Sequence, residues 1–475
     1  MEEYDLIVIG SGAGMNVASN AVNSGMRVAV IEHFLMGGTC LNNGCIPSKI
    51  LLHPADVIRE LSEAASIGVK GTITDIDFPF IMNRMSSFVG EGREEMEKGI
   101  ASTEMLIWHR ETGEFIEDYT LKVGNKKVSA PKIVIASGAR QLVPAIPGLQ
   151  KIGYIDNISV LDLKKQPKSL IILGGGYIAC EYGHFFSAIG TEVTILGRNP
   201  RLLKREEPEI SELVRRRFSK YAKIHTGYEA VEVRKKGANK VVLARSKKDN
   251  KIYKFKAEEI MLAMGRRSNT DLLKPEKTGV ETDKAGWIKV NEFLETTKPN
   301  IWALGDATGK HMFRHTANYE SGVVWRNAFT DHKMKTDYHA VPHAVFGYPQ
   351  VGSVGMTEAE AKAAGYNILV GRAMYTDVAK GFAMGEKDSL VKVIVDGESR
   401  RILGCHIVGS EASDLVQQVV YLMNVGKQDY MPLASSQIIH PALSEVVINA
   451  FANLRPPGHA HGHQHGHEHG HEHQH

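Results

Sequence analysis

The sequence predicts an α/β protein with two Rossmann-like dinucleotide-binding domains and a C-terminal α+β domain. Two stretches, 5–32 and 169–198, each run through an apolar strand, a glycine-rich turn, a helix and a second strand, the order of a nucleotide-binding βαβ unit. From about residue 338 the pattern shifts to short strands and helices. The chain has 475 residues, which is sufficient for two or three domains.

The first unit begins close to the N-terminus. An apolar strand leads into Gly10, Gly12 and Gly14, and the helix and strand that follow end at Glu32. Glycines at such a turn let the backbone approach a pyrophosphate, which the helix N-terminus then stabilises. Glu32 is placed to bind a ribose hydroxyl. Met15 occupies the third glycine position of the usual spacing, so we expect the packing of helix on strand to differ locally.

The second unit has the complete spacing, with Gly174 and Gly176 in the turn and Ala179 as the small third residue. Its second strand ends in Gly197 rather than an acid, and Arg198 follows directly. A ribose-binding acid would repel a 2′-phosphate, whereas an arginine accepts one. We therefore expect NADPH rather than NADH at this site.

Between the two units, residues 37–49 place Cys40 and Cys45 five positions apart in a chain with four cysteines. A disulfide needs Cα atoms about 4.4–6.8 Å apart, and a regular helix would separate this pair by more than that. The pair can close only on a distorted turn, which the Asn-Asn-Gly sequence at 42–44 tolerates. A strained local disulfide is easily reduced, and a nearby helix N-terminus favours the thiolate. The pattern indicates a redox-active pair.

The composition excludes several classes of function. With 43% hydrophobic and 23% charged residues, the chain has the composition of a soluble globular protein. The net charge is only +3, and no basic run resembles a nucleic-acid footprint. No apolar stretch is long enough to span a membrane, and the N-terminus enters a strand without room for a targeting peptide. We expect a reducing cytoplasm, a catalytic disulfide, and core positions for Cys180 and Cys405.

With these units in place, the chain resembles the pyridine nucleotide–disulfide oxidoreductases from residue 4 to about 454. Further marks of the resemblance are Ile-Ala-Ser-Gly138-Ala-Arg, Ala-Met-Gly265-Arg-Arg-Ser-Asn, Ala-Leu-Gly-Asp306 and Ile-His440-Pro-Ala-Leu-Ser-Glu445. The resemblance implies a homodimer with shared active sites. It also implies an FAD-binding domain at 1–150 and 271–335, an inserted NAD(P)-binding domain at 151–270, a dimerisation domain at 336–457 and a tail at 458–475.

The resemblance also implies roles around the FAD. Asp306 would hold the ribityl chain, Thr39 and the motif glycines would contact the cofactor, and Lys49 would lie near flavin N5 with Glu181 as its partner. Tyr177 would gate the nicotinamide pocket.

The same resemblance assigns the catalytic residues. Cys45 would face the flavin as a thiolate, and Cys40 would attack the substrate. His440 of the partner subunit would carry the proton, and Glu445 would orient its imidazole.

The substrate is less closely defined. The segments 313–320, 377–384 and 440–447 resemble mycothione reductase, and the first helix lacks the arginine that glutathione reductases carry. A small-molecule disulfide other than glutathione is therefore our first interpretation. Two alternatives stay open, a metal-ion reductase and a dihydrolipoamide dehydrogenase, although most of the latter use an acid for NAD where Gly197 stands. For a metal, Cu²⁺ is favoured over Hg²⁺, because no cysteine pair follows Cys405.

The C-terminus carries a histidine at every second position from 459 on. Such a tract has no apolar residues to fold around, so we expect it to be disordered. Imidazoles at this density bind Cu²⁺, Ni²⁺ or Zn²⁺, with copper bound most strongly. The predicted metal ligands are His459, His461, His463, His465, His467, His469, His471, His473 and His475.

Overall fold

A computed structural model describes residues 1–458, and the chain divides into two compact units, one from Met1 to Gln350 and one from Val351 on. The predicted metal ligands from His459 to His475 lie outside the described residues.

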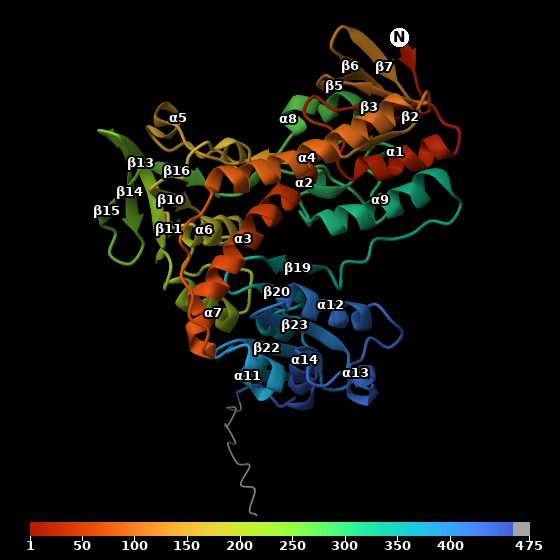
Figure 1. Cartoon of the computed structure of the whole chain (residues 1–475). Coiled ribbons are helices and arrows are strands. Elements are labelled where there is room, and N and C mark those ends of the chain that lie inside the picture. Colours follow the sequence, from red (N-terminus) through yellow and green to blue (C-terminus); the bar gives the residue numbers. More distant parts are fainter. Residues whose placement is uncertain (459–475) are drawn as a thin grey trace, which may run out of the picture. The chain divides into compact units, whose positions relative to one another are not determined.

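The first unit begins with a parallel five-stranded sheet whose central strands are fully buried (Figure 1). Its order is β18 (Ile301–Ala303), β8 (Ile133–Ile135), β2 (Leu6–Ile9), β3 (Val28–Ile31) and β4 (Leu106–His109). Apolar side chains on one face pack with helices α1 (Gly14–Asn23) and α9 (Arg314–Phe329). The other face packs on a second sheet, β1 (Glu2–Glu3), β7 (Lys126–Ser129), β6 (Thr120–Val123) and β5 (Gly113–Glu117). Continuous apolar runs such as Leu-Ile-Val-Ile suit strands covered on both faces.

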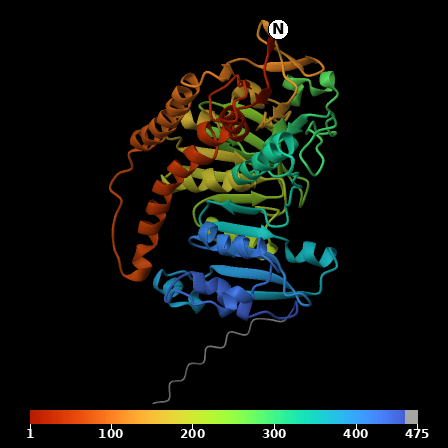
Figure 2. The ribbon, with the colours of Figure 1, turned by 90° about the vertical axis from the view of Figure 1, so that its right-hand side faces the viewer.

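Three helices follow the first βαβ unit: α2 (Gly38–Asn42), α3 (Cys45–Glu63) and α4 (Phe78–Ala101). The long helices α3 and α4 lie side by side in both views (Figures 1 and 2). Helix α3 also packs on α6 (Tyr177–Ala188), which belongs to the second nucleotide unit. The cysteine motif is thereby held next to both dinucleotide-binding units.

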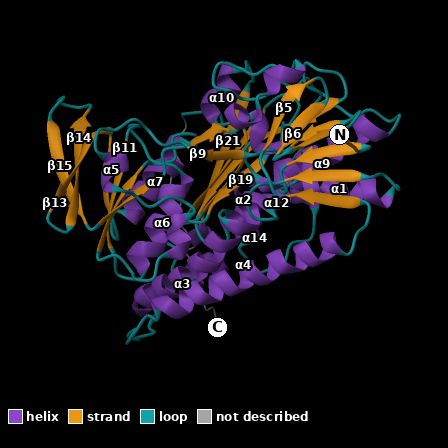
Figure 3. Ribbon diagram, turned by 90° about the horizontal axis from the view of Figure 1, so that it is seen from above, coloured by secondary structure: helices purple, strands orange, loops and turns teal. Residues whose placement is uncertain are grey.

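The second unit of the sequence pattern forms a parallel sheet in the order β12 (Lys223–Thr226), β11 (Glu192–Gly197), β10 (Ser169–Leu173) and β16 (Glu259–Leu262). An antiparallel meander of β13 (Tyr228–Lys236), β14 (Asn239–Ser246) and β15 (Ile252–Ala257) lies beside this sheet (Figure 3), and apolar side chains of the two sheets share one core. The strands β9 (Ala139–Gln141) and β17 (Arg266–Ser268) pair with each other. The remaining elements are α5 (Leu149–Ile152), α7 (Pro208–Phe218), α8 (Thr270–Leu273) and β19 (Pro342–Val345).

The unit from Val351 on is built on antiparallel strands in the order β20 (Val351–Gly355), β23 (Ile402–Val408), β22 (Leu390–Asp396) and β21 (Ile368–Met374). Helix α12 (Ala412–Met423) packs on β20 and β23, and α14 (Ser444–Ala452) packs on β21 and β22. Shorter helices are α10 (Glu358–Ala363), α11 (Ala379–Ala383) and α13 (Met431–Ser435). The α/β fold with an α+β C-terminal unit is as predicted. Cys180 and Cys405 are buried, as expected.

Candidate functional site

The first glycine turn is shaped by close contact with the neighbouring strand. Gly10 has φ +102°, and a Cβ there would lie 2.2 Å from the carbonyl oxygen of Ala136. A Cβ on Gly14 would lie 2.7 Å from Val8 Cγ1. The close approach of helix to strand thus occurs at Gly14, one residue before Met15, which packs partly buried against the core. The local difference expected at Met15 is therefore accommodated by the glycine beside it.

Glu32, at the end of β3, is held in place before any ligand arrives. Its Oε2 accepts hydrogen bonds from the backbone nitrogen and the hydroxyl of Ser11, both at 3.0 Å. The Ser11 hydroxyl accepts in turn from the Gly37 nitrogen at 3.0 Å. One serine therefore connects the glycine turn, the acid predicted to bind a ribose and the start of the cysteine motif.

A pocket of about 460 Å³ joins most of the residues predicted for the first cofactor and the redox pair. Its walls include Gly10, Gly12, Glu32, Thr39, Cys40, Cys45, Gly138 and Asp306. Gly265 lies just outside these walls, with φ +111°, directly before Arg266, which does line the pocket.

Several polar atoms in this pocket need a ligand. Within the described residues, the buried Ser137 Oγ and Asn43 Oδ1 have no hydrogen-bond partner. Arg266 Nε lies 3.5 Å from Asp306 Oδ2, and burial raises the pKa of the Asp306 carboxyl. Unpaired buried polar groups are costly, so such atoms mark a place where a polar molecule binds. Hydroxyl and phosphate groups of a flavin dinucleotide fit this donor and acceptor set.

The two cysteines lie on either side of a helix break. Cys40 belongs to α2, and Cys45 is the first residue of α3, while Asn43 and Gly44 adopt non-helical backbone between them. A Cβ on Gly44 would lie 2.8 Å from the carbonyl oxygen of Thr39. The distorted turn predicted from the spacing is present, and both cysteines are free thiols in this structure.

The two thiols have opposite acidities. The pKa of Cys45 is lowered to about 7, first by the hydrogen bond with Cys40 and then by the Lys49 ammonium. The pKa of Cys40 is raised by the same hydrogen bond and by burial. Lys49 Nζ lies 2.9 Å from Glu181 Oε2, and Glu181 is buried, so the predicted partners do meet. The arrangement favours a thiolate at Cys45.

The second glycine turn repeats the close contact of the first. Gly174 has φ +138°, and a Cβ there would lie 2.1 Å from the carbonyl oxygen of Ala263. A Cβ on Gly176 would meet open space, and Ala179 is fully buried in α6. Tyr177 is the first residue of α6 and is 40% exposed.

Tyr177 lies within electrostatic range of Cys45. Burial of the phenol raises its pKa, the charge of Arg266 lowers this pKa, and the charges of Asp306, Glu181 and Cys45 raise it.

Arg198 extends into solvent at the end of β11, with 62% of its side chain exposed. Its Nη1 lies 3.9 Å from Glu229 Oε1 on β13. The cation predicted for the 2′-phosphate is therefore accessible and only loosely paired.

His440 and Glu445 form their pair within the unit from Val351 on. His440 Nδ1 lies 2.8 Å from Glu445 Oε1, and Glu445 Oε2 accepts from the Ala442 nitrogen at 2.9 Å. The hydrogen bond with His440 lowers the pKa of the Glu445 carboxyl. The imidazole is exposed, so it is accessible to another subunit. Its meeting with Cys40 stays a prediction.

Several residues of the pocket were not predicted. Arg266 lies in the Ala-Met-Gly-Arg motif, where a basic residue after a glycine was an available signal. Asn43 and Ser137 lie in the motifs at 42–44 and 135–140, but their unpaired atoms are evident only in the folded chain. Arg314 also lines the pocket, and its charge acts to lower the pKa of Cys40, against the larger raising effects.

Among residues 1–458, no group of three or more His, Cys, Asp or Glu side chains is arranged to hold a metal ion. No helix in this part is both long and apolar enough to cross a membrane.

The family models match nearly the whole chain. Residues 4–322 match pyridine nucleotide-disulphide oxidoreductase, and residues 341–451 match the dimerisation domain of the same family. The second match indicates a homodimer. Consistently, the C-terminal unit exposes large apolar side chains, namely Phe382, Tyr421, Val425, Ile438 and Ile439.

Several named proteins are similar in sequence or structure to this chain over most of its length. A mercuric reductase from Lysinibacillus sphaericus is 33% identical over 87% of this chain and 76% of its own length. A mycothione reductase from Mycobacterium tuberculosis is 33% identical over 96% of this chain and 100% of its own. The Cu(II) complex of the HOCl-induced flavoprotein disulfide reductase RclA from Escherichia coli has a TM-score of 0.85 at 29% identity, covering 95% of this chain and 99% of that one.

Proposed function

The chain belongs to the pyridine nucleotide-disulphide oxidoreductase family, and on this premise we propose that it is an NADPH-dependent flavoprotein that reduces a small-molecule disulfide through Cys40 and Cys45. The observation that carries the proposal is the opposite acidity of the two thiols at the edge of a pocket with unpaired polar atoms. The reaction would convert NADPH, a proton and a disulfide into NADP⁺ and two thiols. A reducing cytoplasm suits this chemistry and is part of the proposal.

The cofactor sites are assigned from the geometry of the two turns. FAD would occupy the pocket between Gly10 and Asp306, and when bound it would supply the redox chemistry that links a nicotinamide to the disulfide. Glu32 would accept from a ribose hydroxyl, and Ser137 and Asn43 would gain the partners that they lack. NADPH would bind at Gly174–Ala179 with its 2′-phosphate on Arg198, and Tyr177 would move aside for the nicotinamide.

The protein residues divide the thiol chemistry between them. In the reduced pair Cys45 is the thiolate, and Lys49 stabilises that charge. Cys40, with its raised pKa, needs a base before it can attack a substrate sulfur, and His440 of the partner subunit would take that proton. The attack forms a mixed disulfide and releases one thiol, which receives the proton. Cys45 then attacks the Cys40 sulfur of the mixed disulfide, which restores the disulfide of the pair and releases the second product as a thiolate that takes up a proton from solvent.

Cofactor choice gives a direct test. We expect a higher kcat/KM with NADPH than with NADH, and reversal of this order by Arg198→Glu. A charge-assisted contact contributes about 1.5–3 kcal/mol, so the ratio should change by about ten- to a hundredfold. Equal kcat/KM with both cofactors in the native enzyme would show that Arg198 does not select NADPH, and would restore dihydrolipoamide dehydrogenase as a candidate.

A second candidate function is the reduction of Cu²⁺ at the same cysteine pair. It is favoured by the similarity to a reductase solved as a Cu(II) complex and by the histidine-rich sequence after residue 458. Mercury is less favoured than copper, because the chain has no cysteine after Cys405 to deliver it.

One experiment distinguishes disulfide reduction from copper reduction. NADPH oxidation is measured with lipoamide, with mycothione-like disulfides, and with Cu²⁺ and Hg²⁺, for the full chain and for a chain lacking residues 459–475. A disulfide reductase should turn over its substrate at about 10 s⁻¹ and be indifferent to the truncation. A copper reductase should be slow with every disulfide, release Cu⁺ to a chelator, and lose affinity without the tail. His440→Gln should impair disulfide reduction strongly and metal reduction much less.

A further inference from the structure

Strand β11 has no acidic residue at its end, but a glutamate on β13 lies close to that end. Gly197 stands at the end of β11, where a carboxylate would select for NADH. Glu229, near the start of β13 in the adjacent meander, places its Oε1 3.9 Å from Arg198 Nη1. Both side chains are about half exposed, so the pair is loose and can exchange partners.

The meander is anchored directly to the loop that carries Arg198. The Gly227 nitrogen donates to the Asn199 carbonyl at 2.8 Å, and the Lys247 nitrogen donates to the Gly227 carbonyl at 2.8 Å. These backbone bonds keep the first residues of β13 and the end of β14 beside the adenosine end of the predicted NADPH site.

Arg245 is the cross-strand partner of Glu229. The β13–β14 ladder pairs these two residues directly, and Arg245 is exposed. Side chains of directly opposed residues leave the same face of a sheet with Cβ atoms about 4.5–5.5 Å apart. Glu229 therefore has two arginines as neighbours, Arg198 at 3.9 Å and Arg245 opposite it in the ladder.

We propose that Glu229 and Arg245 are specificity-determining residues for the dinucleotide. Glu229 holds Arg198 when no phosphate is present, and Arg245 takes over the carboxylate when Arg198 turns to the 2′-phosphate. Without Arg245, phosphate binding would leave an unpaired carboxylate next to a dianion, which costs affinity. With NADH, the Arg198–Glu229 pair stays intact. The inference rests on the proposed binding of NADPH at Arg198. It gives a role to the glutamate that lies close to Arg198 although β11 itself ends without an acid.

The test measures binding of 2′-phospho-ADP-ribose and of ADP-ribose to the flavin-loaded enzyme by calorimetry. Glu229→Gln should tighten binding of the phosphorylated probe by about two- to fivefold, the range of one exposed ion pair, and leave ADP-ribose unchanged or weaker. Arg245→Gln should weaken binding of the phosphorylated probe by a similar factor. In the double variant the effect of Arg245→Gln should disappear, because the carboxylate that it serves is gone.

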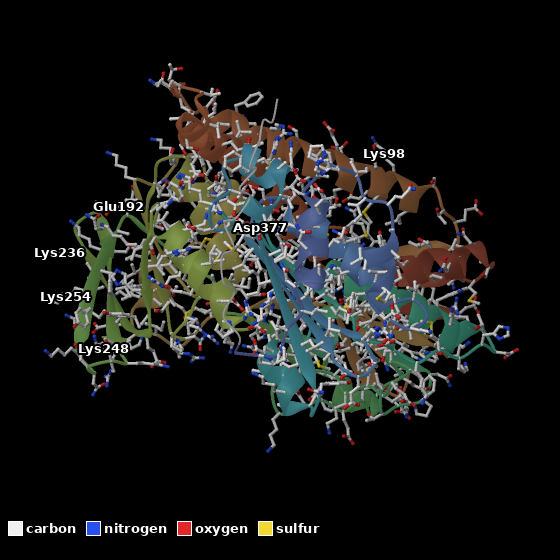
Figure 4. All side chains as sticks on the ribbon, turned by 90° about the horizontal axis from the view of Figure 1, so that it is seen from below. Lys98, Glu192, Lys236, Lys248, Lys254 and Asp377 are labelled. Carbon is white, nitrogen blue, oxygen red and sulfur yellow. The ribbon has the colours of Figure 1, made fainter. Side chains whose placement is uncertain are left out.

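The control is Lys236→Gln on the same sheet. Ten basic residues and one acidic residue lie between 234 and 256, so a loss of positive charge alone could weaken anion binding. Lys236 ends β13, seven residues and about 23 Å from Glu229, and it is labelled with Lys248 and Lys254 in Figure 4. We expect Lys236→Gln to change the affinity for either probe by no more than the loss of one positive charge at that distance would.

Each other outcome contradicts the inference. If Arg245→Gln weakens the phosphorylated probe equally in the native background and in the Glu229→Gln background, Arg245 is a direct phosphate ligand and the exchange is wrong. If Glu229→Gln does not change the affinity for the phosphorylated probe, the Glu229 carboxylate does not compete with the 2′-phosphate for Arg198. Failure of the NADPH proposal is distinguishable, because Arg198→Glu would then leave the ratio of the two probes unchanged. Flavin absorbance and thermal unfolding show that each variant is folded.

Discussion

The two glycine turns solve the same backbone problem and differ at the ends of their strands. A Cβ at Gly10 or at Gly174 would lie 2.2 or 2.1 Å from a carbonyl oxygen of the neighbouring strand, so both turns require glycine. Glu32 is only 11% exposed and is held by Ser11, whereas Arg198 is 62% exposed and lies 3.9 Å from its carboxylate. The first site is preassembled, which suits a resident cofactor, and the second is open, which suits a dinucleotide that enters and leaves at each turnover.

The largest effects should come from alanine at the two turns. Each substitution combines left-handed backbone strain, about 1–3 kcal/mol, with a backbone clash. Gly10→Ala should yield protein without FAD, and Gly174→Ala should retain FAD but lose reduction by NADPH, as measured by flavin content and stopped-flow absorbance. Gly99→Ala in α4, outside both turns, is the control, because a Cβ there meets open space. Loss of flavin from Gly174→Ala would show that the two turns do not act separately.

An intermediate effect is expected from Glu32→Gln. The amide keeps the shape of the side chain but removes the charge from the hydrogen bonds with Ser11 and with a ribose hydroxyl. We expect the FAD dissociation constant to rise by about ten- to a hundredfold, measured by fluorescence on reconstitution of the apoprotein. Glu3→Gln, an exposed glutamate on β1, should leave it unchanged. An unchanged constant in Glu32→Gln would mean that the preassembled acid does not contribute to cofactor retention.

The smallest effects concern the Lys49–Glu181 ion pair, which joins α3 to the second nucleotide unit. Lys49 lowers the pKa of Cys45 and Glu181 raises it. Removing the cation in Lys49→Met should therefore raise this pKa, and Glu181→Gln should lower it. The measurement is the pH profile of iodoacetamide alkylation in a Cys40→Ser background, since only the thiolate reacts. The midpoint should move to higher pH in the first variant and to lower pH in the second; shifts in the same direction would contradict the assignment.

Local features of the site were predictable from the sequence because neighbouring residues produce them. The two turns, Glu32 at a strand end and the break between Cys40 and Cys45 each depend on a few consecutive residues. The predicted partnership of Lys49 and Glu181 came from the family resemblance, since 132 positions separate the two residues. The packing at Gly14 shows the limit of spacing rules, because a glycine beside Met15 makes the contact expected of the third motif position.

The sequence by itself determined the fold class, the two βαβ units and the distorted turn between Cys40 and Cys45, because glycine turns, apolar strands and cysteine spacing are encoded over short stretches. Only the tertiary structure decided which distant groups face each other. Arg266 meets Asp306, Arg198 meets Glu229, and Ser137 and Asn43 keep unpaired atoms in the pocket. The opposite acidities of the two thiols also arise there, because a pKa depends on burial and on charges brought close by folding. No pattern along the chain specifies these distances, since they follow from the packing of α3 on α6 and of the meander beside β11.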